Sequence, residues 1–193
     1  FRDETTGASI WRMTNDPAVD QGDYYDIPAW NADGSLMTFM TQRNGANQRW
    51  LMNANGARLR PFPSEDGNPV GAGFWSVIDP GRFYTSANTE DSTLVIAIDP
   101  WSGKRETVVK AKGDLGSMQP PHPSERYFLF GSREDSFNVA SAAHVVALDG
   151  TVRTAKFEKR WHRLRFTRSD DQRLFVNFDD PRQQFTILPD GTE

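Results

Sequence analysis

The sequence contains no cysteine and only three histidines among its 193 residues. The lack of cysteine excludes disulfide bonds, thiolate nucleophiles and cysteine-based zinc sites, so any metal would need histidine and carboxylate ligands. No stretch approaches the roughly 18 uninterrupted apolar residues of a membrane-spanning helix, and no basic leader with an apolar segment is visible. We therefore expect no membrane span.

The sequence also lacks a strong excess of either charge, because its 22 basic and 26 acidic residues are spread evenly and give a net charge of −4. Such a balance provides no basic surface for a phosphate backbone, so we expect no nucleic-acid partner. No segment keeps a helical period over three turns, which excludes βαβ folds and helical bundles. The 37% of hydrophobic residues nevertheless suffice for a globular core.

What the sequence does contain is a repeat of turn signals. The turns Asn55-Gly56, Ser102-Gly103 and Asp149-Gly150 place their glycines 47 and 47 residues apart, and Asp190-Gly191 follows after 41. A second set of positions, each starting a short apolar run, is spaced by 47, 44 and 47 residues: Leu36, Phe83, Tyr127 and Leu174. A fixed period of this size indicates a repeat architecture.

Each repeat unit is predicted to form four short strands joined by hairpins, because short β-branched and aromatic runs alternate with two-residue turns. In the first unit the expected strands are Asp26–Trp30, Leu36–Thr41, Arg49–Asn53 and Ala57–Phe62. An all-β chain with a blade-sized period predicts a β-propeller. The expected blades span residues 20–62, 70–109, 115–156 and 161–193.

The segment 5–14 resembles an outer strand without a blade of its own, so we expect it to close a ring. Two closures are open: a compact ring of about four blades, or a larger ring of about six to eight blades of which this single propeller region, 1–193, is a part. We favour the larger ring. Its bare blade faces would then associate or be covered.

The first unit resembles a known family of propellers. Residues 28–39, with the Asp33-Gly34 turn, and residues 50–56 resemble the PD40 repeat of TolB-like propellers. The opening from Phe1 to Gly7, together with Tyr24-Tyr25, more narrowly resembles the start of the oligogalacturonate lyase family. The resemblance covers about the first 60 residues well.

The resemblance implies a bacterial, periplasmic or secreted protein, with a cytoplasmic location as the alternative, that cleaves uronate oligosaccharides by β-elimination. It also implies a divalent metal, Mn²⁺, held by histidine and glutamine near the central channel, mostly in later blades. No complete metal site is evident in this chain, which has only His122, His144 and His162. The alternative is a non-catalytic TolB-like scaffold that binds a protein or a glycan on its channel face.

Polar residues gather where the innermost strands are expected to begin. His162 aligns with Asp26 there and could ligate a metal or accept a proton, or be an ordinary surface histidine. Asp23, Tyr24 and Asp26 could bind a sugar hydroxyl or a cation, and Gln119 is the analogous residue of the third unit. The alternative is a hydrogen-bonded loop on a solvated rim.

Planar guanidinium groups suit two-point recognition of a uronate carboxylate. The candidates are Arg43, Arg133, Arg163 and Arg165, which could instead pair with neighbouring acids. Arg163, next to His162, is the one we assign to substrate binding.

The remaining histidines and the tryptophans are interpreted as structural. His122 aligns with Asn31 and should cap a turn, and His144 should lie half-buried in a strand. The tryptophans divide by position: Trp30 and Trp75 in the core, Trp11 and Trp50 packing within strands, and Trp101 exposed in a turn.

Overall fold

The computed structural model describes the chain except for residues 24–26, 134–140, 160, 168–171, 179–182 and 190–193. The described residues contain strands and no helix, and the strands form four separate antiparallel sheets. The all-β prediction is therefore confirmed. None of these residues belongs to a helix that is long and apolar enough to cross a membrane.

Each sheet follows the chain as a meander, so that hydrogen-bonded neighbours are consecutive in sequence. The first two sheets consist of β1 (Asp20–Gln21), β2 (Leu36–Thr41), β3 (Gln48–Asn53) and β4 (Arg60–Pro61), and of β5 (Phe74–Trp75), β6 (Phe83–Asn88), β7 (Ser92–Ile98) and β8 (Arg105–Lys112). The third and fourth consist of β9 (Ser117–Gln119), β10 (Tyr127–Arg133), β11 (Ser141–Ala147) and β12 (Val152–Phe157), and of β13 (Trp161–Phe166), β14 (Leu174–Phe178) and β15 (Gln183–Ile187).

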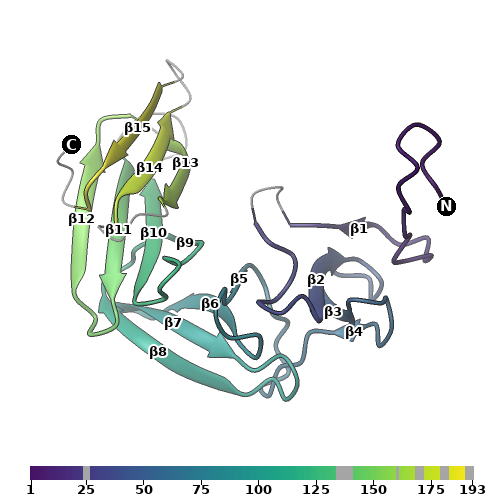
Figure 1. Cartoon of the computed structure of the whole chain (residues 1–193). Coiled ribbons are helices and arrows are strands. Elements are labelled where there is room, and N and C mark those ends of the chain that lie inside the picture. The colour runs from purple at the N-terminus through teal and green to yellow at the C-terminus, as the bar shows by residue number, and fades with distance from the viewer. Residues whose placement is uncertain (24–26, 134–140, 160, 168–171, 179–182, 190–193) are drawn as a thin grey trace.

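The four sheets follow one another along an open arc, with the first and the fourth at its two ends (Figure 1). The strands β5, β9 and β13 lie on the concave side of the arc, and β8 and β12 lie on its convex side (Figure 1). This arrangement is that of propeller blades around part of a central channel. The chain is thus a partial propeller, and the described sheets do not close into a compact ring.

The repeated glycines lie in equivalent turns, between the third and fourth strands of successive blades. Gly56, Gly103 and Gly150 all have positive φ, at 79°, 75° and 84°. A Cβ on Gly103 would lie 2.5 Å from the Ser64 nitrogen, and one on Gly150 would lie 2.7 Å from the Lys110 oxygen. At Gly103 and Gly150 the left-handed turn therefore meets the preceding blade closely enough to exclude a side chain.

The N-terminal segment 5–14 does not form a strand, and its one bridge joins Arg2 to Ser9. Trp11 is 82% exposed, so the expectation that it packs within a strand was wrong. Met13 nevertheless lies against the Gly56 turn. In the second and third blades the equivalent turns meet Ser64, which follows β4, and Lys110, which belongs to β8. The closing role of this segment stays a prediction.

The innermost strand of the first blade differs from the expected Asp26–Trp30. It pairs with β2 at Asp20–Gln21, and Trp30 makes an isolated bridge to Met37. Asp26 lies outside the described residues.

The core lies between consecutive sheets, in three apolar clusters. Phe62 of the first blade packs with Trp75 and Phe83 of the second, at ring-centroid separations of 6.2 and 5.0 Å. In the next interface the rings of Tyr84 and Phe128 meet edge to face at 5.2 Å. Each blade is therefore stabilised mainly by its neighbours.

Trp30 and Trp75 occupy the same register but differ in burial. Trp75 is 4% exposed, and its indole N–H donates to the Ala29 carbonyl of the preceding blade at 2.9 Å. Trp30 is 41% exposed, so its assignment to the core was wrong. The reason is that Trp30 belongs to the first sheet, and no described sheet precedes it to supply such a contact.

One position in the turn after the innermost strand joins each blade to the next. Asn31, Ser76 and His122 occupy it, because each donates its backbone N–H to the residue that closes the same turn. In the first blade the Asn31 side chain donates to the Pro80 carbonyl of the second blade at 3.1 Å.

In the second blade Ser76 donates its hydroxyl to Glu125 of the third blade at 2.6 Å. The buried Glu125 carboxylate also accepts the Val77 amide at 2.6 Å and the Tyr84 hydroxyl at 2.7 Å. Burial and this carboxylate raise the pKa of Tyr84 to about 12. Glu125 adopts φ 54°, a strained value for any residue other than glycine. The hydrogen bonds that its carboxylate accepts therefore compensate this backbone strain.

The third blade uses His122, whose ring meets Phe166 of the fourth blade edge to face at 5.0 Å. Its Nδ1 accepts the Ser124 amide at 3.1 Å, which confirms the expected turn-capping role. The residue is 4% exposed.

We predict that Trp75→Ala lowers the free energy of unfolding by about 3–5 kcal/mol, because it empties a packed core position. Trp30→Ala should cost less, about 1 kcal/mol, since Trp30 is 41% exposed and gives up less packed surface. Urea denaturation of both variants measures the difference. Equal losses would contradict the distinct burial of the two rings.

We also predict that Glu125→Ala lowers the free energy of unfolding by about 3 kcal/mol, because several buried donors lose their acceptor together. Glu90→Ala, in an exposed turn of the second blade, is the matched control and should stay within about 0.5 kcal/mol of the unmodified chain. Thermal or urea unfolding measures both. If the two variants were equally stable, the carboxylate would not hold these blades together.

Candidate functional site

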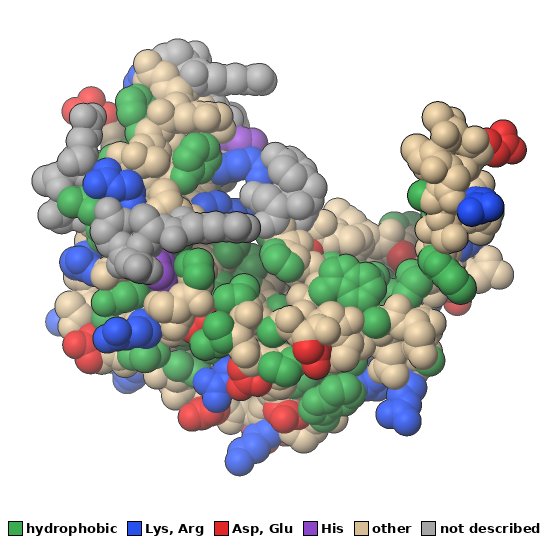
Figure 2. All heavy atoms as spheres, in the orientation of Figure 1, with side chains coloured by type: hydrophobic (Ala, Val, Ile, Leu, Met, Phe, Trp, Pro, Cys, Tyr) green, Lys and Arg blue, Asp and Glu red, His purple; other side chains and the backbone are tan. Residues whose placement is uncertain are grey.

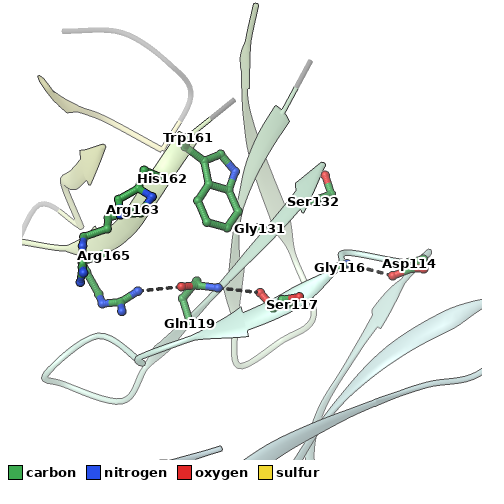
Figure 3. Close-up of a pocket in the computed structure, with 10 residues that line it drawn as sticks. All are labelled: Asp114, Gly116, Ser117, Gln119, Gly131, Ser132, Trp161, His162, Arg163 and Arg165. Atoms are coloured by element: carbon green, nitrogen blue, oxygen red, sulfur yellow. Dashed lines mark hydrogen bonds between the residues drawn. The ribbon is translucent and has the colours of Figure 1, made fainter. Parts of the chain in front are cut away.

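A cavity of about 710 Å³ opens between the third and fourth sheets. Its walls come from the connection before β9, from β9 and β10, and from β13 (Figure 3). The lining residues are Asp114, Gly116, Ser117, Gln119, Gly131, Ser132, Trp161, His162, Arg163 and Arg165. Because β9 and β13 lie on the concave side of the arc, the cavity faces the channel.

Four residues proposed from the sequence meet at this cavity, namely Gln119, His162, Arg163 and Arg165. A register shift between Trp161 and Arg163 interrupts the regular pairing of β13 with β14. Such a bulge redirects side chains that would otherwise alternate strictly between the faces of a sheet. It accounts for three consecutive residues, 161–163, lining one cavity.

A hydrogen bond between blades fixes part of the cationic wall. The Arg165 guanidinium donates to the Gln119 Oε1 at 2.6 Å, and the Gln119 amide donates to the Ser117 carbonyl at 3.3 Å (Figure 3). The amide thus holds a guanidinium of the fourth blade at the cavity of the third. In this structure Gln119 therefore positions the Arg165 guanidinium.

Two glycines let the walls approach closely. A Cβ on Gly131 would lie 2.2 Å from the Trp161 ring, and one on Gly116 would lie 2.4 Å from the Gly131 oxygen. Any side chain at either place would displace its neighbour. The indole of Trp161 consequently lies directly over the backbone of β10 (Figure 3).

The wall opposite the arginines carries a carboxylate. Asp114 accepts the Gly116 amide at 2.8 Å and the Asn88 side-chain amide at 2.9 Å. Arg163 and Arg165 lie at the other side of the cavity from Asp114 (Figure 3). The cavity is therefore electrically asymmetric, with cations on β13 and an anion beside β9.

His144 is the half-buried strand histidine that the sequence predicted. Its Nε2 lies 3.0 Å from the Ser132 hydroxyl and its Nδ1 lies 2.9 Å from the Thr154 hydroxyl. Burial lowers the pKa of His144 below its ordinary value, which favours the neutral ring. It thus orients Ser132, which lines the cavity.

Among the other proposed residues, those whose side chains the structure describes do not line this cavity. Asp23 forms a two-point ion pair with the buried Arg49, at 2.8 and 3.0 Å. Arg43 makes a similar pair with Asp20, which is the alternative that we left open for the arginines. Tyr24 and Asp26 lie outside the described residues, as does the side chain of Arg133.

The described residues do not fit a divalent metal. They include no group of three His, Asp or Glu side chains placed to hold one. His162 is the one histidine lining this cavity. A single imidazole with arginines around it does not provide the ligand set of a metal centre.

Sequence reasoning missed Asp114, Gly116, Gly131 and Trp161. The register could have identified Trp161, because it precedes His162 in the same strand. The two glycines carry no turn signal, since their role is close approach between elements distant in sequence. Asp114 is found only when the connection before β9 is placed beside β13.

Comparisons by sequence give no match: no protein family model fits the chain, and no curated protein is significantly similar. Comparisons of structure give several. An oligogalacturonate lyase from Vibrio parahaemolyticus is similar with a TM-score of 0.72 and 16% identity, over 100% of this chain and 57% of that one. An oligogalacturonate lyase in complex with manganese gives 0.75 and 16%, with the same coverage.

TolB from Acinetobacter baumannii is similar with a TM-score of 0.52 and 13% identity, over 98% of this chain and 45% of that one. The chain thus spans 57% of the lyases and less than half of this TolB. Identities this low show the fold alone. The chain is a stretch of β-propeller with the fold shared by TolB and oligogalacturonate lyase, as its first unit suggested.

Proposed function

We propose that the cavity between the third and fourth blades binds the carboxylate of a uronate-containing oligosaccharide. The observation that carries this proposal is the placement of Arg163 and Arg165 on one wall, with His162 beside them. Guanidinium groups recognise a carboxylate through paired, charge-assisted hydrogen bonds. The Trp161 ring in the same wall offers an apolar surface for a sugar.

We further propose that the complete protein cleaves such oligosaccharides by β-elimination. A base removes the proton from the carbon beside the carboxylate, the C–H electrons form a C=C bond, and the bond to the glycosidic oxygen breaks. The arginines would stabilise the negative charge that builds up on the carboxylate, and His162 would accept the proton. The leaving oxygen takes a proton from solvent.

The proposal of catalysis draws on the structural similarity to the oligogalacturonate lyases. A second candidate is a non-catalytic scaffold that binds a glycan or a protein on the channel face. The similarity to TolB over 98% of the chain favours it. For either function we propose a periplasmic or secreted location.

We predict that the chain binds trigalacturonate and that Arg163→Gln weakens binding by about tenfold, since one charge-assisted carboxylate contact is lost. Arg153→Gln is the matched control, because Arg153 is exposed on β12 and does not line the cavity. Titration calorimetry measures both affinities.

Absence of binding, or equal loss in the two variants, would reject the carboxylate site. Ultraviolet absorbance of the unsaturated product separates the two candidates in the full-length protein. A protein that binds trigalacturonate but forms no such product, with or without added Mn²⁺, would be a scaffold.

A further inference from the structure

The turn between β7 and β8 presents an exposed indole on a rigid support. Trp101 is 55% exposed, as its place in a turn predicted, and it does not line the cavity between the third and fourth sheets. The Asp99 carboxylate accepts the Trp101 amide at 2.8 Å and the Ser102 amide at 2.7 Å. Gly103 anchors the same turn against Ser64, which follows β4. Because the turn is fixed, little conformational freedom would be lost when a ligand binds to the ring.

An arginine of the first blade lies over this indole. The guanidinium carbon of Arg60, in β4, is 5.6 Å from the centroid of the Trp101 ring, within the range of a cation–π interaction. The Arg60 Nη1 donates to the Arg58 carbonyl at 3.2 Å, which holds the guanidinium in place. Figure 2 shows hydrophobic and basic side chains next to each other on the lower edge of the arc, below β4. Two blades thus build one aromatic and cationic surface.

A second cation adjoins the first, and no described carboxylate forms an ion pair with either. Burial and then the charge of Arg58 lower the pKa of Arg60, so the two positive charges interact. Neither arginine is in the ion pairs of the described residues. Two acids of the β4–β5 connection are engaged by Arg105 instead: Asp66 pairs with its guanidinium at 2.9 Å, and Glu65 accepts its amide at 2.9 Å. The positive charge beside Trp101 therefore suits an anionic ligand.

The ring and the arginines together favour one kind of anion. An indole packs against the apolar face of a pyranose, and guanidinium groups bind carboxylates through charge-assisted hydrogen bonds. A uronate unit carries both features on one ring. An acidic peptide would engage the arginines but offers no sugar face to the indole.

We propose that Trp101, Arg58 and Arg60 form a peripheral subsite for a polysaccharide that contains uronate units. The site itself follows from the ring and the two arginines, and the choice of uronate rests on the proposed function. Trp101 lies outside the cavity of that function, so a polymer would meet two separate binding sites on one protein. Two sites on one protein increase the retention of a long polymer more than that of a short oligomer.

The test is native electrophoresis at low salt in gels with and without polygalacturonate. The polymer concentration that halves the mobility of each variant measures its affinity. We expect Arg60→Gln and Trp101→Ala each to weaken retention by about three- to tenfold, since each removes one contact to the polymer. Both effects should shrink when salt is added, because the arginines are near the surface.

Two substitutions remove the same groups elsewhere and serve as matched controls. Arg153→Gln removes an exposed arginine that lies over the Tyr127 ring at 6.0 Å and changes the net charge equally. Trp11→Ala removes an indole that is 82% exposed. Both controls should leave retention unchanged. Circular dichroism of each variant, matched to that of the unmodified chain, shows that the fold is kept.

Two further polymers test the ligand chemistry. Fully methyl-esterified polygalacturonate keeps the sugar and loses the charge, so it should retain the protein much less than the acid does. Polyglutamate keeps the charge and lacks the sugar, and Trp101→Ala should not change its retention. If Trp101→Ala weakened the retention by both acidic polymers equally, the assignment to a uronate polysaccharide would be overturned.

The outcomes also separate this subsite from the proposed cavity. If Arg163→Gln weakens retention while Trp101→Ala and Arg60→Gln behave as their controls do, the cavity stands and the subsite is overturned. If calorimetry detects no binding at the cavity and Trp101→Ala still weakens retention, the subsite stands without the proposed function. If both operate, combining Arg163→Gln with Trp101→Ala weakens retention more than either substitution alone.

Discussion

The arc depends on one position, the residue that opens the turn after each innermost strand. Its backbone closes the turn of its own blade, and its side chain reaches the next blade. Asn31 does so with an amide to a carbonyl, Ser76 with a hydroxyl to a buried carboxylate, and His122 with a ring against Phe166. Because each blade alone leaves apolar faces uncovered, these contacts fix how the faces meet.

The site inherits its geometry from the third of these joints. His122 and Phe166 set β13 against the turn that follows β9, so Gln119 and Arg165 come within hydrogen-bond distance. The bulge in β13 then turns His162 and Arg163 toward the same space. Gly131 lets Trp161 close the wall at van der Waals contact. A cationic wall thus follows from the way in which two blades are stacked.

The sequence alone predicted the parts that repeat. The strand expected at Leu36–Thr41 has those bounds in the structure, and the glycines 47 residues apart lie in equivalent left-handed turns. It failed where burial depends on a neighbour: Trp30 and Trp75 share a register, yet only Trp75 has a preceding blade to cover it. The repeat in the sequence indicates where strands and turns form, but it does not show which sheet faces are covered by a neighbouring blade.

For the site, register placed Gln119 and His162 near the channel and guanidinium chemistry suggested Arg163, and the structure brings the three together. It also grouped Asp23 with them, but a salt bridge between Asp23 and the buried Arg49 holds that carboxylate in the first blade. Ion pairs between residues far apart in sequence leave no periodic signal. Asp114 and Gly131 were missed because their contacts, with Asn88 and Trp161, also join residues far apart in sequence.

The joints differ in chemistry, and this difference has a mechanical consequence. In a linear array each interface holds only two neighbours, so the array bends most easily at its least constrained interface. The joining residue makes hydrogen bonds between the first three blades, whereas at the third joint it makes a ring contact and the hydrogen bond between Gln119 and Arg165 constrains the interface. A ligand that touches both β9 and β13 would add a further link across this interface, so occupancy would stiffen the curvature of the whole arc.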